Sequence, residues 1–290
     1  MDRHVSPLRY PGGKLKVVEY IKQLFEVNNL CGGHYIEPYA GGASVALSLL
    51  FCNYARTIHI NDVDCSIYAF WHSVLHNTDE LCRLITETPV TMDNWCRQFE
   101  IQRNKEQVDL LTLGFSTFFL NRTNRSGILR GGVIGGKEQT GTYKMDVRFN
   151  KVDLIHRIRT VAACANRITL TNQDAVELIQ GIQHPTDNTL CYLDPPYYIK
   201  GRDLYLNYYN DADHCNIAQA ISHYAGHWII SYDAVDFLKE LYRDYRQTEY
   251  FLNYSAGNPA KGKEIMIYSH DLVQPDVEIV KVKRKKQTRI

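Results

Sequence analysis

In YIEPYAGGASVALSLLFCNYARTIHIND, residues 35–62, the hydrophobic pattern changes several times within one short segment, and these changes indicate the class of fold. Tyr35 and Ile36 predict a short strand, which runs into a loop of small residues. The loop leads into a helix that contains Val45, Ala46, Leu49 and Leu50. A second strand through residues 57–60 ends at Asp62. A strand, a glycine loop, a helix and a strand that ends in an acid form the first unit of an alternating α/β fold.

The same alternation returns after residue 165. Strands are predicted at Ile168–Thr171, Leu190–Leu193 and Trp228–Ser231, with helices at 14–29, from Asp174 onward and at Asp211–Tyr224. Strands that alternate with helices imply a mostly parallel sheet with helices on both faces. Tyr250–Asn253 and Glu264–Tyr268, around a loop at 257–262, predict an antiparallel hairpin at the edge of that sheet.

The segment between these two parts has a different composition. It is helical and moderately polar from Cys65 to about Val108, and from Phe115 to Phe149 no clear periodicity remains. A new helix is predicted from Val152 to Ala165. We therefore predict a core domain built from residues 1–64 and 165–280, an inserted domain at 65–164, and a basic, disordered tail at 281–290.

The charge is distributed unevenly along the chain. The whole chain has a net charge of +1, but residues 115–170 hold ten Lys or Arg against three Asp or Glu, so the remainder is negative. A local excess of this size is typical of a segment that binds a polyanion, and a solvated basic face would look the same.

The glycine loop Glu37-Pro-Tyr-Ala-Gly-Gly-Ala-Ser44 favours a ligand that approaches the backbone closely, because small residues leave room there. Asp62 follows Gly42 by twenty residues and ends a strand, where an acid can accept hydrogen bonds from ribose hydroxyls. A helix N-cap for the segment from Cys65 is the alternative for Asp62. The loop does not match the dinucleotide fingerprint, and Pro11-Gly-Gly-Lys14 does not match a P-loop, which disfavours hydride transfer and ATP hydrolysis. It suits an adenosine-containing cofactor without a pyrophosphate.

Leu193-Asp-Pro-Pro-Tyr-Tyr198 is the sharpest local motif. Two prolines after a strand force the chain out of the sheet into a rigid loop, which either simply ends the strand or projects into the ligand crevice. The chemistry of an aromatic amine fits the second interpretation, because such an amine needs acceptors for both N–H hydrogens. Asp194 and the carbonyl of Pro195 can supply them, and Tyr197 offers a flat face for stacking.

The motifs Tyr10-Pro-Gly-Gly-Lys14, Glu37 to Ser44 and Asp194-Pro-Pro-Tyr197, in this order and spacing, resemble the DNA adenine methylase (Dam, or D12 class) family. The segments around Asp203, Ile230-Ser-Tyr-Asp233 and Gly262-Lys-Glu264 also resemble this family. The resemblance covers nearly the whole chain. It implies a Rossmann-like, class-α methyltransferase that transfers a methyl group from S-adenosyl-L-methionine to N6 of a flipped adenine in double-stranded DNA.

Residue by residue, the resemblance implies a cofactor site and a catalytic motif. The expected cofactor contacts are Tyr10, Lys14, Glu37, Tyr39, Ala40, Gly41, Gly42, Asp62, Asp174 and Asp194, and the expected catalytic residues are Asp194, Pro195, Pro196 and Tyr197. Asp174 departs from the family pattern because Gln173 stands where the family usually has glycine. A helix N-cap is the alternative role for Asp174.

In the insert, Asn121-Arg-Thr-Asn-Arg-Ser-Gly-Ile-Leu-Arg130 resembles the target-recognition β-hairpin of the family, and Arg130 matches a base-contacting position. Phosphate contacts are assigned to Lys137, Lys144 and Arg148, whose alternative is surface solvation. The expected DNA-contacting residues are thus Asn121, Arg122, Asn124, Arg125, Ser126, Ile128, Arg130, Lys137, Lys144 and Arg148.

Composition disfavours several other classes of protein. No apolar run is long enough to span a membrane, and no signal pattern opens the chain, so a cytoplasmic location in a bacterial or phage-infected cell is expected. The eight cysteines form no C-x-x-C pair, which indicates reduced core residues and no metal site.

Three questions stay open at the level of the sequence. The substrate could be adenine in RNA, or an amide nitrogen in a protein, although the basic insert argues against protein. A catalytically dead relative that regulates by binding DNA is the second rival, although Asp62 and Asp194 are both present. A cognate restriction endonuclease is a possible partner in the same system.

Overall fold

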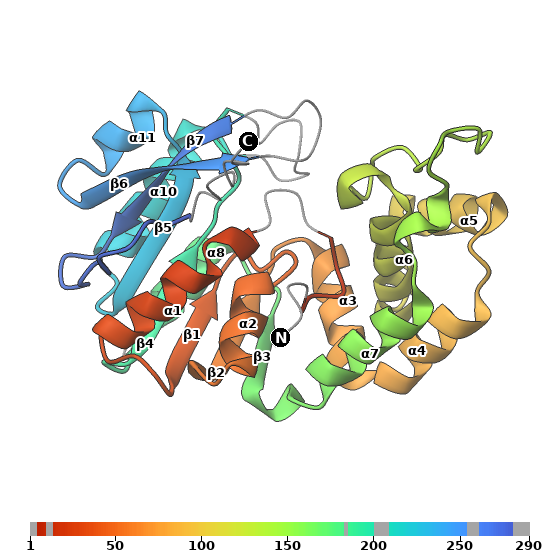
Figure 1. Cartoon of the computed structure of the whole chain (residues 1–290), viewed down its shortest axis with the longest axis horizontal. Coiled ribbons are helices and arrows are strands. Elements are labelled where there is room, and N and C mark those ends of the chain that lie inside the picture. The colour runs from red at the N-terminus through yellow and green to blue at the C-terminus, as the bar shows by residue number, and fades with distance from the viewer. Residues whose placement is uncertain (1–4, 10–13, 183–184, 200–208, 254–260, 281–290) are drawn as a thin grey trace, which may run out of the picture.

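The computed structural model describes residues 5–9, 14–182, 185–199, 209–253 and 261–280. These residues form a sheet lobe and a helical lobe, which stand side by side in Figure 1. Tyr10 and the predicted tail at 281–290 lie outside the described residues, as does the segment around Asp203.

The sheet lobe contains a seven-stranded sheet in the order β3-β2-β1-β4-β5-β7-β6. Its strands are β1 (Gly33–Glu37), β2 (Ala55–Asn61), β3 (Ile168–Thr171), β4 (Thr189–Leu193), β5 (His227–Asp233), β6 (Arg246–Asn253) and β7 (Lys261–Tyr268). The first five strands of this order pair in parallel, and β7 pairs antiparallel with both β5 and β6. The predicted parallel sheet and its antiparallel edge hairpin are both confirmed.

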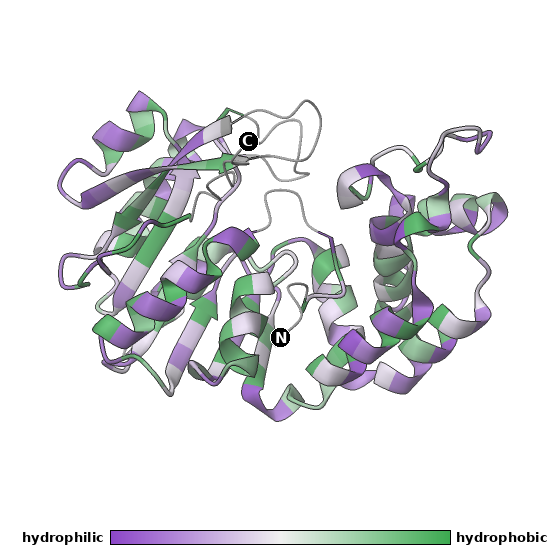
Figure 2. Ribbon diagram, viewed as in Figure 1, coloured by the Kyte–Doolittle hydropathy of each residue, from purple (hydrophilic) through white to green (hydrophobic). Residues whose placement is uncertain are grey.

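Successive residues of the central strands point to opposite faces of the sheet, so each face has its own core. Tyr35, Leu190 and Ile229 pack on one face, together with residues of α1 (Val18–Val27) and α2 (Ser44–Phe51). Their neighbours Ile36, Cys191 and Ile230 pack on the other, together with residues of α8 (Ala175–Gly181), α10 (Asp211–Ser222) and α11 (Asp236–Leu241). Helices therefore cover both faces, as predicted, and α11 is an addition. Figure 2 shows hydrophobic and hydrophilic residues alternating along α1 and α11, whereas α2 is mostly hydrophobic.

The helical lobe consists of α3 (Cys65–His76), α4 (Thr78–Glu87), α5 (Met92–Arg103), α6 (Leu110–Thr123) and α7 (Lys151–Ala162). Its apolar residues continue the core of the first sheet face, since Phe70, Phe118 and Leu154 belong to the same buried cluster as Tyr35. Trp71 of α3 also donates from Nε1 to the carbonyl of Gly41, at 2.9 Å. The glycine loop of the sheet is thus anchored to the first helix of the other lobe.

Helix α6 corrects the sequence-based expectation, which found no periodicity from Phe115 onward. Nearly all its residues from Leu113 to Thr123 are buried, so it has no polar face and no amphipathic stripe to detect. Its hydroxyls are satisfied internally, for example Thr117 by the carbonyl of Leu113 at 2.8 Å. Gly114 lets α6 approach α3 closely, because a Cβ there would lie 2.5 Å from the carbonyl oxygen of Ala69.

Candidate active site and nucleic-acid interface

Acidic side chains meet at the carboxyl ends of three neighbouring strands. Glu37 ends β1, Asp62 follows β2 and Asp194 follows β4. The carboxyl edge of a parallel sheet is where such folds bind ligands. The strand order β2-β1-β4 therefore brings together residues that are up to 157 positions apart in the sequence.

The glycine loop is held against the end of β2 by backbone contacts. Gly41 donates its N–H to Asp62 Oδ2 at 2.8 Å, and Ala40 donates to the carbonyl of Asn61 at 2.8 Å. Gly41 and Ala43 both have left-handed backbones, with φ of 45° and 47°. A non-glycine residue in this region is uncommon, so Ala43 marks a constrained turn into α2.

Asp62 is buried beneath this loop, with 9% of its surface exposed. It also accepts the backbone N–H of Asp64 at 3.0 Å. Burial, followed by the nearby Asp64, raises the pKa of Asp62 to about 7. The alternative role as a helix cap falls to Asp64, whose carboxylate accepts the N–H of Ser66 at the start of α3.

Glu37 is buried even more deeply, at 4% exposure. Its Oε1 lies 3.4 Å from the hydroxyl of Tyr35, while Oε2 is buried and has no hydrogen-bond partner among the described residues. Burial, followed by the charge of Asp194, raises the pKa of Glu37 well above its usual value. A buried acceptor without a partner is costly, and a bound cation or donor would relieve that cost.

Asp194 is fixed through one of its two oxygens. Its Oδ1 lies 3.1 Å from Lys14 Nζ and accepts a hydrogen bond from Ser231 Oγ at 2.8 Å. Ser231 is itself held by the hydroxyl of Tyr192 at 2.8 Å. The side chain of Asp194 is 24% exposed, whereas Lys14 is 4% exposed. One edge of the carboxylate therefore faces the interior and part of the group reaches solvent.

The ammonium group of Lys14 lies at the centre of a buried network. Its Nζ donates to Tyr197 Oη at 3.0 Å and lies 3.1 Å from both Asp194 Oδ1 and Glu264 Oε2. Burial alone would lower the pKa of Lys14, but the charge of Asp194, followed by Tyr197 and Glu264, outweighs it and raises that pKa well above its usual value. The three hydrogens of the ammonium group thus point to acceptors within the protein.

The loop after Asp194 is tied to the next strand. The backbone N–H groups of Tyr198 and Ile199 donate to the two oxygens of Asp233, at 2.8 and 2.9 Å. Tyr197 is 3% exposed, and its hydroxyl donates to Glu264 Oε1 at 2.8 Å. In this structure the ring of Tyr197 is packed inside, and its face is not presented to solvent for stacking. Pro195 is buried and Pro196 is half-buried.

Asp174 lies one strand away, beyond β3. It is exposed and caps α8 by accepting the N–H of Val176 at 2.8 Å, so the cap that sequence left as an alternative is present. Asn61 fixes this corner, because its amide group donates to the carbonyls of Pro38 and Gln173. Tyr39, from the glycine loop, lies across from Tyr209 with their hydroxyl oxygens 3.1 Å apart.

The segment predicted to recognise DNA, residues 121–130, forms a tight loop in the helical lobe, which we call the recognition loop. The resemblance predicts a hairpin with two extended strands. The structure has instead one antiparallel bridge, between Asn124 and Val133. Arg125 N–H donates to the carbonyl of Gly132 across the loop, at 3.0 Å. Gly127 has φ of 78°, and a Cβ there would lie 2.4 Å from the carbonyl oxygen of Arg9. The loop therefore folds back like a hairpin and packs against the N-terminal segment.

Two asparagines of this segment face inward. Asn121 accepts the N–H of Arg9 and donates to the carbonyls of Arg9 and Gly127, at 2.6–2.9 Å. Asn124 accepts from Trp95 Nε1 at 2.7 Å and donates to two loop carbonyls. Both are at most 1% exposed. Their amide groups are engaged in holding the loop, which leaves none of their donors for a base edge.

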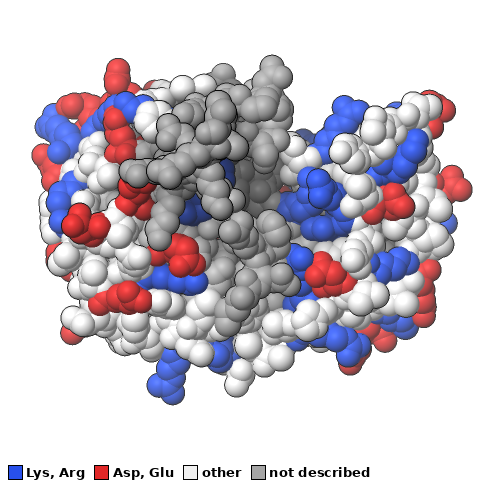
Figure 3. Space-filling model, in the orientation of Figure 1, with Lys and Arg blue, Asp and Glu red and all other residues white. Residues whose placement is uncertain are grey.

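The basic residues of the lobe differ in exposure. Arg122 is half-buried and bonds the carbonyl of Arg148 at 2.8 Å. Ser126 and Ile128 are half-buried too, whereas the exposed members of the predicted DNA-contacting set are Arg125, Arg130, Lys137, Lys144 and Arg148. Figure 3 shows Lys and Arg side chains gathered on the helical lobe, on the side turned toward the sheet lobe.

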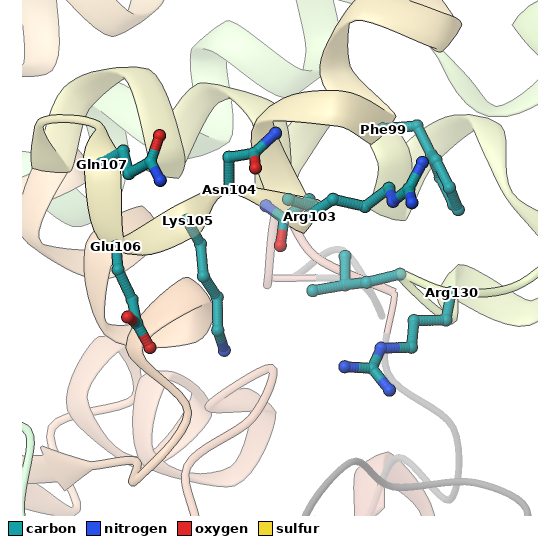
Figure 4. A pocket seen from close by; sticks show the side chains of 9 residues that line it. Phe99, Arg103, Asn104, Lys105, Glu106, Gln107 and Arg130 are labelled. Carbon is teal, nitrogen blue, oxygen red and sulfur yellow. The ribbon is translucent and has the colours of Figure 1, made fainter.

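A pocket of about 570 Å³ opens beside the recognition loop. Leu129 and Arg130 form one wall, and the end of α5 with the turn after it forms the other. Arg130 and Lys105 extend toward the same open side of this pocket in Figure 4. Lys105 is partly neutralised by Asp64, at 3.6 Å, and Arg103 by Glu100, at 3.0 Å. This leaves Arg130 as the cation of the pocket wall best placed to reach a partner.

The order of the strands, the acids at their carboxyl ends and the fixed loop after Asp194 are those of a Rossmann-like methyltransferase. A family model, the D12 class N6 adenine-specific DNA methyltransferase, matches residues 10–254, and the chain belongs to this family. No curated protein matches the chain. Within the described residues, no helix is long and apolar enough to cross a membrane, and no cluster of three potential metal ligands is found.

Reasoning from sequence missed the residues that support the motifs. Ser231, Asp233 and Glu264 all lie in segments that resemble the family, but no role was assigned to them. Asn61 and Trp71 carried no signal of their own. Strand periodicity could have suggested only that Ser231, near the carboxyl end of β5, shares an edge with Asp194.

Proposed function

We propose that this protein transfers a methyl group from S-adenosyl-L-methionine to the N6 amino group of an adenine flipped out of double-stranded DNA. The observation that carries the proposal is the geometry of Asp194. Its Oδ1 is held by Lys14 and Ser231, while no described residue donates to Oδ2. This second oxygen can accept an N–H of the target amine, and the carbonyl of Pro195 can accept the other.

The acidic strand ends support a cationic cofactor. Glu37, Asp62 and Asp194 all have raised pKa values because burial disfavours their charged forms. A ligand that brings positive charge would stabilise these carboxylates, and the partnerless Oε2 of Glu37 is ready to accept a bond from its ammonium group. Asp62 is placed for the ribose hydroxyls. Such a cofactor, when bound, supplies a methyl group already activated on a sulfonium.

The protein then has to position and polarise the amine. The exocyclic nitrogen of adenine is a weak nucleophile, and hydrogen bonds to Asp194 Oδ2 and Pro195 favour a lone pair aimed at the methyl donor. Transfer by direct displacement needs no covalent enzyme intermediate. A base inside a duplex cannot reach this edge of the sheet, so the proposal includes base flipping, at a cost of about a few kcal/mol.

The helical lobe supports DNA as the substrate. The exposed cations Arg125, Arg130, Lys137, Lys144 and Arg148 lie on the lobe whose basic side chains face the sheet. Phosphate contacts from such residues supply affinity, and Arg130 is our candidate for a guanine edge. Arg122 is half-buried and donates to the carbonyl of Arg148, so it holds the segment that carries Arg148.

The test is methyl transfer from labelled S-adenosyl-L-methionine to unmethylated genomic DNA and to matched RNA, with nucleoside analysis and mapping of modified positions. We expect N6-methyladenine in one short DNA motif. Label in RNA alone would replace DNA by RNA in the proposal. No label in either, with cofactor binding intact, would favour a DNA-binding regulator. The mapped motif would also allow a search for a restriction endonuclease of the same specificity.

A further inference from the structure

We propose that Glu264 is a positioning residue for the reaction. By sharing the ammonium group of Lys14, Glu264 weakens the effect of that ammonium on the Asp194 carboxylate, which stays a strong acceptor for the target amine. The inference rests on the proposed function and extends it to a strand, β7, that lies beyond the residues matched by the family model.

Glu264 is the most completely enclosed acid of the site, with 0% of its surface exposed. Its Oε2 accepts from Lys14 Nζ at 3.1 Å and from the hydroxyl of Tyr250 at 2.6 Å. Its Oε1 accepts from the hydroxyl of Tyr197 at 2.8 Å. The carboxyl group acts as the acceptor in all three bonds, which is the pattern of a carboxylate.

A single lysine therefore serves two carboxylates. Lys14 Nζ lies 3.1 Å from Asp194 and 3.1 Å from Glu264, so the three groups together carry one negative charge. With Asp194 as its only partner, the ammonium would neutralise that carboxylate and draw electron density away from the oxygen that meets the amine. Glu264 offsets this effect, because its charge opposes that of Lys14 at Asp194.

The surroundings of the Asp194 carboxylate agree with this balance. The ionisable side chains of the described residues that face it or its lysine are Lys14, Glu37, Tyr192, Tyr197, Tyr250 and Glu264. Burial raises the pKa of Asp194 first, Lys14 lowers it, and Glu264 raises it again. Removing the charge of Glu264 alone should thus lower the pKa of Asp194 and make it a weaker acceptor.

A purely structural role for Glu264 predicts something different. If the residue only satisfied Lys14 and the two tyrosines, its loss would reduce activity by the same factor at every pH. The profile of rate against pH separates the two roles. Its acid limb, the fall in rate at low pH, reflects protonation of Asp194, so its position depends on the charge of Glu264 and not on packing.

The experiment measures single-turnover methylation of DNA against pH, at saturating S-adenosyl-L-methionine, for the wild type, Glu264→Gln, Lys14→Gln and the double variant. For Glu264→Gln we expect a plateau rate lower by about tenfold or more, with the acid limb moved down by about one pH unit. For Lys14→Gln the limb moves up, because Glu264 then repels Asp194 directly. Tyr250→Phe is the matched control, since it removes one neutral donor to Glu264 and should leave the limb unmoved.

If Glu264→Gln does not fold, the double variant still provides the test. It removes the charges of Lys14 and Glu264 together, so neither is left buried without the other. Adding Glu264→Gln to Lys14→Gln should move the acid limb back down, because the carboxylate that repels Asp194 is then gone. An acid limb that stays at its Lys14→Gln position overturns the proposal for Glu264, as does a Glu264→Gln profile reduced equally at all pH values. A wild-type protein that leaves DNA unmethylated overturns the proposed function itself, and with it this inference.

Discussion

The two lobes hold their functional side chains in opposite ways. At the edge of the sheet, Lys14 binds both Asp194 and Glu264, and neighbouring hydroxyls contact all three, within 3.1 Å. On the helical lobe, the side chains of Arg125 and Arg130 are exposed. A reacting group must be fixed to a fraction of an ångström, whereas a group that meets DNA must be able to reach it.

The difference extends to the polar residues behind each set. Asn121 and Asn124 fix the backbone of the recognition loop, much as Ser231 fixes the carboxylate of Asp194. In the proposed function, both lobes therefore have an outer residue that meets the substrate and an inner residue that holds it. Single substitutions should separate these roles.

Asp194→Ala should separate chemistry from binding most sharply. We expect the rate of methyl transfer to fall by about 10³-fold, because the amine loses its acceptor. The fold should persist because Lys14 keeps Glu264 as a partner. Affinity for DNA, measured by fluorescence anisotropy, should change by less than about threefold. Retained activity in this variant would show that Asp194 does not bind the amine.

Asn121→Ala should destabilise the helical lobe. It leaves two backbone groups of Arg9 and the carbonyl of Gly127 without partners, so the free energy of unfolding should fall by about 2–3 kcal/mol. Arg125→Ala in the same loop is the control and should cost less than about 0.5 kcal/mol. Urea unfolding measures both. Equal losses would mean that the inward asparagine does no more for stability than an exposed arginine.

The fold followed from sequence where periodicity was strong. Strands β1 to β5 alternate with helices, and that pattern predicted a parallel sheet with helices on both faces. Helix α6 escaped because it is buried nearly all round, and a helix without a polar face has no period of 3.6. The recognition loop was expected as a hairpin from resemblance, and only one bridge forms.

The site was predictable only in part, for a related reason. Glu37, Asp62 and Asp194 end strands, so their motifs also place them at one edge of the sheet. Lys14 and Glu264 are in contact although they lie 250 positions apart in the sequence, and no local pattern predicts such a contact. Asn121 and Arg130 belong to one polar segment, and sequence does not show which of them turns inward.

Arg130→Ala tests whether the exposed wall of the pocket reads sequence. We expect binding to the mapped site to weaken by about 1–3 kcal/mol, with little change on unrelated DNA. Competition between cognate and scrambled duplexes measures the difference. Lys137→Ala is the matched control and should weaken both equally. A uniform loss for Arg130→Ala would reassign it to the phosphates.

We expect the affinity for the cofactor to depend on pH through Asp62, which has no counterpart among the exposed cations of the helical lobe. Its pKa is raised to about 7, so the carboxylate is protonated below that pH and ionised above it. Affinity for S-adenosyl-L-methionine should therefore rise about tenfold per pH unit below 7 and then level off. Calorimetry between pH 5.5 and 8.5, values chosen to span about 1.5 units on either side of that pKa, measures this. The Asp62→Asn variant should bind the cofactor weakly and without this pH dependence. An unchanged pH dependence in the variant would mean that another group titrates.

The smallest effect concerns the exposed cations. Each phosphate contact releases condensed counterions, so Lys137→Ala should reduce the slope of log affinity against log salt by about 0.9. Lys151 lies in the same basic stretch, but its ammonium is engaged by the carbonyls of Thr86 and Thr88, at 2.7 and 2.9 Å. Lys151→Ala should therefore leave the slope unchanged. If both variants reduce it equally, net charge alone governs binding, and the contrast between fixed and free side chains does not hold in the helical lobe.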